Sequence, residues 1–368
     1  MEPPALLCNT EATLTAALPH LQGCSVLILD CEGLRLGERG GALSLVTLRT
    51  TAPSPSRTYI LDFVRLPRAA LEPVFDVLRA PTVLKVLFDG RMDYSALYHG
   101  YGVALTNVLD VQLVDVASRQ SRGEGQAAQF RRLQRYLPRI NLYSNTEAYQ
   151  QVHKLSGLNE CVMEHNITTA TASCKGSGTF SRLPVAVHSS DLCLIPVDHD
   201  RWLLRPLPQS YLSYASADVA LIHALYNKFM QSRYVSPVLR SQSDLYISMW
   251  KHHQPAAYEA HLRHPLPPLG VLNTPGVSSA SILCTVCGRE LAETAFPARA
   301  RSVIAEHRCW ICRAVAAKSS SNRQWEFDLE TFDPIEEQDD WEAQDDWEQD
   351  DWDDGPLSAR DIAFWDYE

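Results

Sequence analysis

The chain has 368 residues, 45% of them hydrophobic, which is enough for one large domain with additions or for two domains. No stretch approaches the roughly 18 consecutive apolar residues of a membrane span, and the N-terminus lacks the basic and apolar regions of a signal peptide. Residues 326–368 carry 19 acids and one base, whereas the other 325 residues carry 25 acids and 32 bases. We therefore expect a protein of the nucleus or cytoplasm, neither secreted nor membrane-bound, whose mildly basic body suits a polyanionic partner.

The first 115 residues predict a mixed α/β domain. Three segments have a helical spacing of apolar residues: 10–21, which begins at the N-cap candidate Thr10, 70–80 and 93–102. Four apolar runs have the character of strands: 25–30, 42–49, 58–63 and 82–88. Strands that alternate with helices predict a sheet covered by helices.

The rest of the chain divides by composition. A less regular, basic stretch at 116–157 leads to a Ser/Thr/Gly-rich surface loop at 170–192 and a long helix at 209–232. We predict four regions: a domain at 1–240, a helical and Pro-rich linker at 241–282, a cysteine module at 283–316 and a disordered tail at 317–368. In the tail, Trp341, Trp347 and Trp352 recur between acids at a spacing that fits neither a helix nor a strand.

Acidic residues gather where the predicted elements end. Asp30 and Glu32 are two apart at the end of the strand in SVLILDCEG, so both side chains leave the same face. Two carboxylates this close repel each other unless a cation neutralises them. Asp93 follows a strand-to-helix turn, with Asp89 as its rival, and Tyr214 and Asp218 are four apart, hence neighbours on one helix face.

This ordered set of acids predicts metal-assisted phosphodiester hydrolysis. Each element taken alone is more often a solvated turn, a helix cap or a chance pair. Two divalent ions held by about four carboxylates activate a water and stabilise the leaving oxygen. Ligation by oxygen alone favours Mg²⁺ or Mn²⁺ over zinc.

Three segments within residues 8–232 resemble the DEDD 3′–5′ exonucleases. They are LILDCEGLRLGERGGALSLVTL, KVLFDGRMDYSALYHGYGVALTNVLDVQLVD and WLLRPLPQSYLSYASADVALIHALY. The match is to the ribonuclease D-like branch with a tyrosine in the last motif (DEDDy), and within it to eukaryotic 3′–5′ exonuclease domain-containing proteins. The resemblance implies a ribonuclease H-like fold with a mixed five-stranded sheet flanked by helices.

The resemblance also implies roles for individual residues. The catalytic metal ligands would be Asp30, Glu32, Asp93 and Asp218, and Tyr214 would orient the attacking water. Asp93 is preferred to Asp89 because of its spacing to the following leucine. The implied function is a 3′–5′ exonuclease acting on single-stranded RNA or DNA, with RNA favoured. The alternative is a catalytically silent nucleic-acid-binding adaptor, since some members of this family have lost catalytic acids.

The cysteine module predicts a structural zinc ion. Cys284-x-x-Cys287 and Cys309-x-x-Cys312 are separated by 21 residues, a spacing typical of a site with four thiolates. The alternative is a pair of core cysteine doublets in a reduced protein. A segment this short has too small a core to fold without the metal.

Two further regions are candidates for partner binding. The segment QFRRLQRYLPR interleaves bases and aromatics, so Arg131, Arg132 and Arg135 are candidate phosphate contacts; an amphipathic surface helix explains them equally well. The acidic, tryptophan-containing tail is interpreted as a docking segment for a protein partner, as an intramolecular mimic of nucleic acid, or as a solubilising end. The oligomeric state is left open by the sequence.

Overall fold

The computed structural model describes the greater part of the chain. The described residues are 3–51, 56–134, 137, 139–144, 146–149, 152–167, 197–256, 281–286, 288, 290–297, 307–313 and 316. The loop predicted at 170–192 and the tail predicted at 317–368 lie outside these residues, so both remain predictions.

A six-stranded sheet forms the centre of the molecule, in the order β1-β4-β3-β2-β5-β6. The strands are β1 (Leu6–Cys8), β2 (Val26–Leu34), β3 (Ala42–Thr50), β4 (Thr58–Asp62), β5 (Leu84–Leu87) and β6 (Val108–Asp110). The pairs β2–β3 and β3–β4 are antiparallel, while β1–β4, β2–β5 and β5–β6 are parallel. The sheet is therefore mixed, as expected.

The predicted number of five strands is wrong, because β1 adds a sixth. This strand of three residues pairs with β4 in parallel at the edge of the sheet, with Leu6 opposite Tyr59. A segment this short carries no alternating pattern that identifies a strand, so only its tertiary pairing reveals it. The equally short β6 was likewise not among the four runs that the apolar pattern identified.

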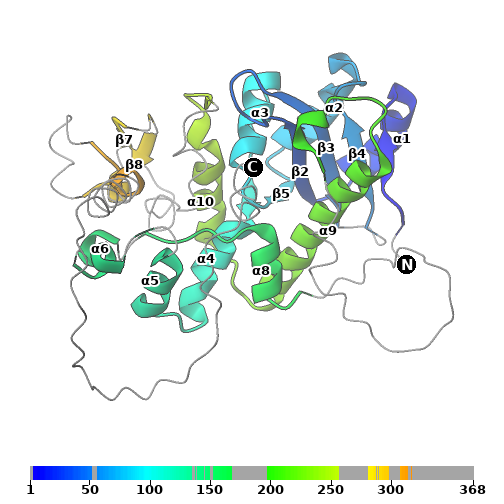
Figure 1. Ribbon diagram of the computed structural model, residues 1–368. Helices are drawn as coiled ribbons and strands as arrows, with labels where there is room; N and C mark the ends of the chain where they lie inside the picture. Colours follow the sequence, from blue (N-terminus) through cyan, green and yellow to red (C-terminus); the bar gives the residue numbers. More distant parts are fainter. Residues whose placement is uncertain are drawn as a thin grey trace, which may run out of the picture.

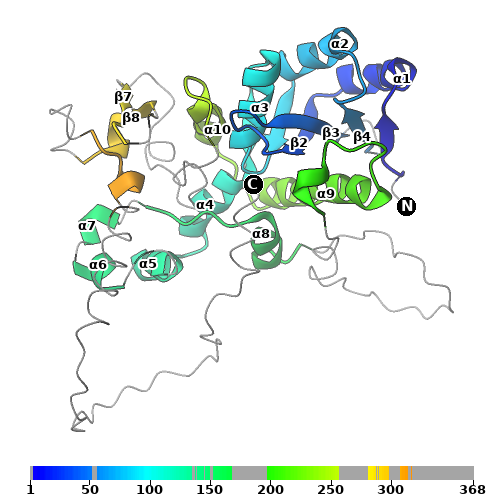
Figure 2. The ribbon, with the colours of Figure 1, turned by 45° about the horizontal axis from the view of Figure 1, so that its top comes forward.

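Helices cover both faces of this sheet (Figures 1 and 2). They are α1 (Glu11–Gln22), α2 (Arg68–Arg79), α3 (Arg91–Tyr101), α4 (Val111–Ser121), α5 (Gln126–Gln134), α6 (Arg139–Ser144), α7 (Thr146–Tyr149), α8 (Leu158–Glu164), α9 (Gln209–Gln231) and α10 (Pro237–Ile247). Figure 2 shows α1, α2 and α3 on one side of the strands and the long α9 on the other. The short helix η2 (His199–Arg201) precedes α9, and η3 (Ser248–Trp250) follows α10.

Local signals fix the ends of the predicted helices. The Thr10 hydroxyl accepts the backbone N–H of Thr13 and so caps α1, as the sequence predicted. Helix α3 ends at Gly102, whose φ of 70° lies in the left-handed region that glycine adopts without strain. These two helices are therefore determined largely by residues close in sequence.

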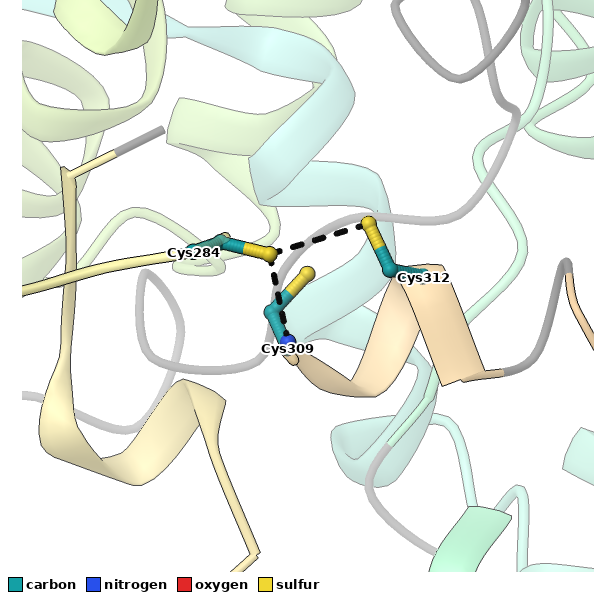
Figure 3. A group of neighbouring side chains, drawn as sticks. All are labelled: Cys284, Cys309 and Cys312. Carbon is teal, nitrogen blue, oxygen red and sulfur yellow. Dashed lines mark hydrogen bonds between the residues drawn. The ribbon is translucent and has the colours of Figure 1, made fainter. Parts of the chain in front are cut away.

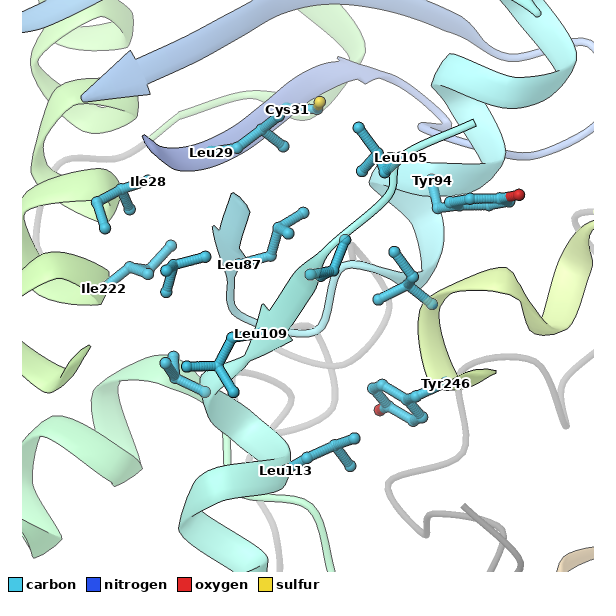
Figure 4. Packing of buried hydrophobic residues seen from close by; sticks show 14 of the residues in the cluster. Ile28, Leu29, Cys31, Leu87, Tyr94, Leu105, Leu109, Leu113, Ile222 and Tyr246 are labelled. Atoms are coloured by element: carbon cyan, nitrogen blue, oxygen red, sulfur yellow. The ribbon is translucent and has the colours of Figure 1, made fainter. Parts of the chain in front are cut away.

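The strand β2 runs through the middle of the core. Its residues Leu27, Ile28 and Leu29 are fully buried. Figure 4 shows Ile28 and Ile222 on one side of the core and Leu29 and Cys31 near Leu105 and Tyr94. Burying a side chain of this size stabilises the fold by about 1.5–3 kcal/mol. The strand that carries the first two acids is thus rigidly held from both faces.

The cysteine-containing region forms a small two-stranded sheet. Strands β7 (Ser281–Leu283) and β8 (Glu290–Ala292) are antiparallel, and the turn η5 (Glu293–Ala295) follows. Phe296 is fully buried beside this sheet. Elsewhere in the described part of the chain, no helix combines the length and apolarity needed to cross a bilayer.

Candidate metal and nuclease site

Three carboxylates converge at the boundary between β2 and α9. Oxygen atoms of Asp30, Glu32 and Asp218 all lie within 4.8 Å of one another. Glu32 is buried and the other two are half-buried. Asp30 and Glu32 share one face of β2, and α9 packs across that strand, so residues 188 positions apart in sequence meet at one point.

The residue after Glu32 allows β3 to approach closely. A β-bulge falls between Glu32 and Gly33, and a Cβ at Gly33 would lie 2.2 Å from the backbone oxygen of Ala42. Because backbone atoms cannot move aside as a flexible side chain can, glycine is required here. The bulge sets the direction of the strand beyond the acid pair.

Asp93 lies directly against the same strand. It is in the first turn of α3, it is buried, and its Oδ1 accepts the backbone N–H of Cys31 at 2.8 Å. Burial and the carboxylates of Asp93 and Asp30 raise the pKa of the Cys31 thiol well above its usual value. Asp93 is thus linked through Cys31, which lies between Asp30 and Glu32 on β2, to the group of three carboxylates.

Asp89 forms an ion pair with Arg91. Its φ of 52° places it in the left-handed region, and its carboxylate forms a two-point ion pair with Arg91, in which Nη2 lies 2.6 Å from Oδ2. The Tyr246 hydroxyl also donates to Asp89 at 3.3 Å. These contacts place Asp89 in an ion pair, and the choice of Asp93 as the ligand stays a prediction.

Asp110 holds the turn from which α3 starts. Its carboxylate accepts the backbone N–H groups of Asp89 at 3.2 Å, Gly90 at 2.9 Å and Gln112 at 3.0 Å. Burial and the nearby Asp89 charge raise the pKa of Asp110 to about 7, although the three N–H donors oppose that shift. Asp110 therefore caps α4 and at the same time fixes the approach of α3 to β2.

Arg205 anchors the start of α9 and was not singled out by the sequence. Its guanidinium pairs with both oxygens of Asp62, at 2.7 and 2.8 Å, and donates to the Ser44 hydroxyl at 3.0 Å. It also donates to the backbone oxygen of Trp202 at 2.7 Å. In the sequence it lies within the third segment that resembles the exonucleases. The arginine ties the segment before Tyr214 and Asp218 to β3 and β4.

Comparison with known proteins identifies the domain. Residues 7–175 match the model of a family described as 3′–5′ exonuclease. This part of the chain is therefore similar to a 3′–5′ exonuclease domain. This confirms the resemblance drawn from the sequence to a DEDD, ribonuclease D-like exonuclease. The matched range includes Asp30, Glu32 and Asp93 but ends before Tyr214 and Asp218, so the structure alone brings the third motif to the site.

Curated relatives share part of this domain. The piRNA biogenesis protein EXD1 of Mus musculus is 35% identical over 102 residues, 27% of this chain and 17% of that protein. The EXD1 protein of Xenopus laevis is 25% identical over 242 residues, 62% of this chain and 45% of that protein. The chain thus spans less than half the length of these relatives.

A solved structure shares the fold. The RNase D of Trypanosoma brucei, crystallised as a complex with GMP, is 20% identical with a TM-score of 0.50. The similarity covers 78% of this chain and 83% of that chain. The exonuclease domain therefore has the architecture of ribonuclease D, with a six-stranded sheet flanked by helices.

A second cluster of metal-ligand types lies near the exonuclease domain's α8. Atoms of Asp115, Cys161 and His165 lie within 4.8 Å of one another and all three residues are buried. The Asp115 carboxylate already accepts from Arg119 at 2.7 Å, Arg122 at 3.1 Å and His165 at 2.8 Å. Hydrogen bonds from His165 and the charge of Arg119 hold the pKa of Asp115 below its usual range despite burial. Two guanidinium groups repel a metal cation, so this cluster stabilises the packing of α4 against α8.

One of the three candidate phosphate contacts in the basic segment has acidic partners within the protein. Arg132 pairs with Glu124 and Glu164, each at 2.6 Å, so its charge is neutralised within the protein. Arg132 therefore belongs to an ion-pair network, and its role as a phosphate contact stays a prediction. Arg131 is exposed on α5 and remains a candidate, while Arg135 lies outside the described residues.

Three cysteines of the C-terminal module converge. Sulfur atoms of Cys284, Cys309 and Cys312 lie within 4.8 Å of one another, and all three residues are buried (Figure 3). The Sγ atoms of Cys284 and Cys312 are 3.8 Å apart, and the Cys309 amide donates to the Cys284 sulfur at 3.4 Å. Cys287 lies outside the described residues, so its part in the site remains a prediction.

Proposed function

We propose that this protein is a metal-dependent 3′–5′ exonuclease that hydrolyses phosphodiester bonds of single-stranded nucleic acid. The observation that carries the proposal is the convergence of Asp218 from α9 on Asp30 and Glu32 from β2. This convergence adds to the family match, because Asp218 lies beyond the residues that the family model covers.

The donor set fits divalent cations. Three carboxylates within 4.8 Å of one another repel strongly when ionised, and a cation between them removes that cost. Oxygen donors without thiol or imidazole suit Mg²⁺ or Mn²⁺. We assign Asp30, Glu32, Asp218 and the adjoining Asp93 as the ligands of two such ions, which when bound supply an activated water and stabilise the leaving oxygen.

The chain's own groups position the reactants. Tyr214 lies one turn before Asp218 on the same face of α9, so its hydroxyl is assigned to orient the water or to move a proton. The Cys31 amide holds Asp93 against the strand by its hydrogen bond of 2.8 Å. The core on both faces of β2 keeps Asp30 and Glu32 from moving as the substrate binds.

RNA is the favoured substrate. The name of the EXD1 relatives assigns those proteins to piRNA biogenesis, and the residues before the acidic segment at 326–368 carry an excess of bases. A basic body attracts the phosphate backbone without selecting a sequence. The exposed Arg131 on α5 is the contact that we assign to this surface.

A 5′-labelled oligonucleotide tests the proposal. With Mg²⁺ or Mn²⁺, the full chain should produce a ladder that shortens from the 3′ end, faster on single-stranded RNA than on DNA. Asp30→Asn and Asp218→Asn should each slow the reaction by more than about 100-fold, because each removes a ligand charge. Asp76→Asn is the matched control, since this exposed acid lies on α2, on the side of the sheet opposite to α9.

The result also decides between enzyme and adaptor. Binding of the oligonucleotide without any ladder, with either metal, would contradict the exonuclease and support the silent adaptor. Equal activity of Asp218→Asn and the unmodified chain would contradict the assigned site. A ladder from the 5′ end, seen with 3′ label, would contradict the direction.

We further propose that the cysteine module binds one structural zinc ion. Four ligands at about 2.3 Å in a tetrahedral site place the sulfur atoms about 3.8 Å apart. The Cys284 and Cys312 sulfurs have this separation, 3.8 Å, which is far too long for a disulfide of about 2.05 Å. Cys284, Cys309 and Cys312 supply three thiolates, and Cys287 is assigned as the fourth because of its spacing in the sequence.

A further inference from the structure

A histidine that the assigned chemistry does not use lies beside the candidate site. His199 belongs to η2, which packs against β2, the strand that carries Asp30 and Glu32. It is half-buried, and the family resemblance assigned it no role. The contacts of its imidazole ring show how it is held.

The ring of His199 is fixed by a buried tryptophan. The indole Nε1–H of Trp202, which is fully buried, donates to His199 Nδ1 at 3.3 Å. Accepting this hydrogen bond places the imidazole proton on Nε2. Burial also lowers the pKa of His199, although Asp198 and Asp200 oppose the shift.

This fixed ring packs edge-on against Tyr214. The His199 and Tyr214 ring centroids are 6.2 Å apart and the two planes are nearly perpendicular, at 89°. The Trp202 ring contacts Tyr214 at 6.2 Å between centroids and Tyr211 at 4.8 Å. The rings of His199 and Trp202, from the segment before α9, thus restrict the side chain of Tyr214, whose hydroxyl is assigned to orient the attacking water.

We propose that His199 is a positioning residue that holds the Tyr214 ring, and thereby its hydroxyl, in the orientation required at the nuclease site. This inference rests on the proposed function, because it gives Tyr214 its role there. A tyrosine ring on a helix face has free rotation about two side-chain bonds, and neighbouring rings remove that freedom. Small losses of orientation are costly, since a displacement of about 1 Å reduces rates by about 100-fold.

A double-mutant cycle with Tyr214→Phe tests the role. His199→Ala should lower kcat about 10-fold with KM within about twofold, since substrate binding does not use the ring. His199→Ala combined with Tyr214→Phe should be no slower than Tyr214→Phe alone, because the hydroxyl that His199 positions is already gone. His199→Phe keeps a ring at this place and should recover most of the rate.

Additive losses in the double variant would overturn the proposal, because a merely structural histidine slows both backgrounds equally. An inactive unmodified chain contradicts the proposed function instead. In that case the ¹⁹F resonance of 3-fluorotyrosine placed at position 214 still tests the inference. It should broaden or split in His199→Ala, and an unchanged resonance would overturn the positioning role. Thermal unfolding of every variant checks that each is folded.

Discussion

Two aspartates four residues apart, Asp89 and Asp93, take opposite roles at the start of α3. Asp89 neutralises the buried Arg91, whose guanidinium also lies over the Tyr246 ring at 5.0 Å. Asp93 turns instead to β2 and accepts the Cys31 amide. Both residues are aspartates near the start of the same helix, so residue type and position in the sequence do not distinguish them. Their contacts in the structure separate a structural acid from a candidate ligand.

Replacing each of these acids by asparagine should separate stability from metal binding. Asp93→Asn should lose most of the thermal stabilisation that Mn²⁺ gives the unmodified chain, because it removes a ligand charge. Asp89→Asn should keep that stabilisation but lower the free energy of unfolding by about 3–5 kcal/mol, because it leaves the buried Arg91 charge uncompensated. Thermal and urea unfolding with Mn²⁺ or EDTA measure both effects. The reverse pattern would make Asp89 the ligand.

At the scale of elements, the site depends on how α9 is tied to the sheet. Tyr214 and Asp218 face β2 from α9, and Arg205 fixes the segment before this helix to the sheet. The ion pair with Asp62 is nearly buried, with exposed fractions of 10% for Arg205 and 3% for Asp62. This contact therefore links β4 to the segment that precedes Tyr214 and Asp218.

Removing the Arg205 side chain should weaken this attachment. Arg205→Met leaves Asp62 buried without its partner, so we expect a loss of about 3–5 kcal/mol in the free energy of unfolding. The matched control is Arg79→Met on α2, where exposed pairs with Glu72 and Asp76 contribute about 0–1 kcal/mol. Urea unfolding of both variants gives the difference. Equal losses would show that Arg205 contributes no more than a surface charge.

At the scale of the whole molecule, the cysteine module and the exonuclease domain share a core. The buried Cys284, Leu291 and Ile311 belong to the same contiguous apolar cluster as the residues of the sheet. Figure 1 shows β7 and β8 near α10 and α6. A metal that organises the cysteines would thus support one edge of the shared core, since so small a module has little core of its own.

Metal analysis tests this interpretation. Native mass spectrometry of the full chain should find one zinc ion per chain, and Co²⁺ in its place should give the absorption of a tetrahedral thiolate site. Cys309→Ser and Cys312→Ser should lose the ion and lower the melting temperature. Cys24→Ser is the control, because this buried cysteine bonds only to a backbone oxygen within α1. Zinc retained in full by Cys309→Ser would contradict the thiolate site.

Much of the fold was predictable because its signals are local. Apolar runs predicted β2, β3, β4 and β5, and the Thr10 cap predicted the start of α1. The three-residue β1 was missed, since its hydrogen bonds go to β4 rather than to sequence neighbours. The pairing of Arg132 with Glu124 and Glu164 was likewise not predictable, because these acids lie 8 and 32 residues away in sequence.

By itself the sequence determined the chemical types at the site and the elements that carry them. The spacing of Asp30 and Glu32 on a strand, and of Tyr214 and Asp218 on a helix, follows from the repeat of each element. Only the tertiary structure decided that these elements meet, that Asp89 faces Arg91, and that His199 packs on Tyr214. Contacts between residues far apart in the chain depend on the packing of the whole core, which no local pattern encodes.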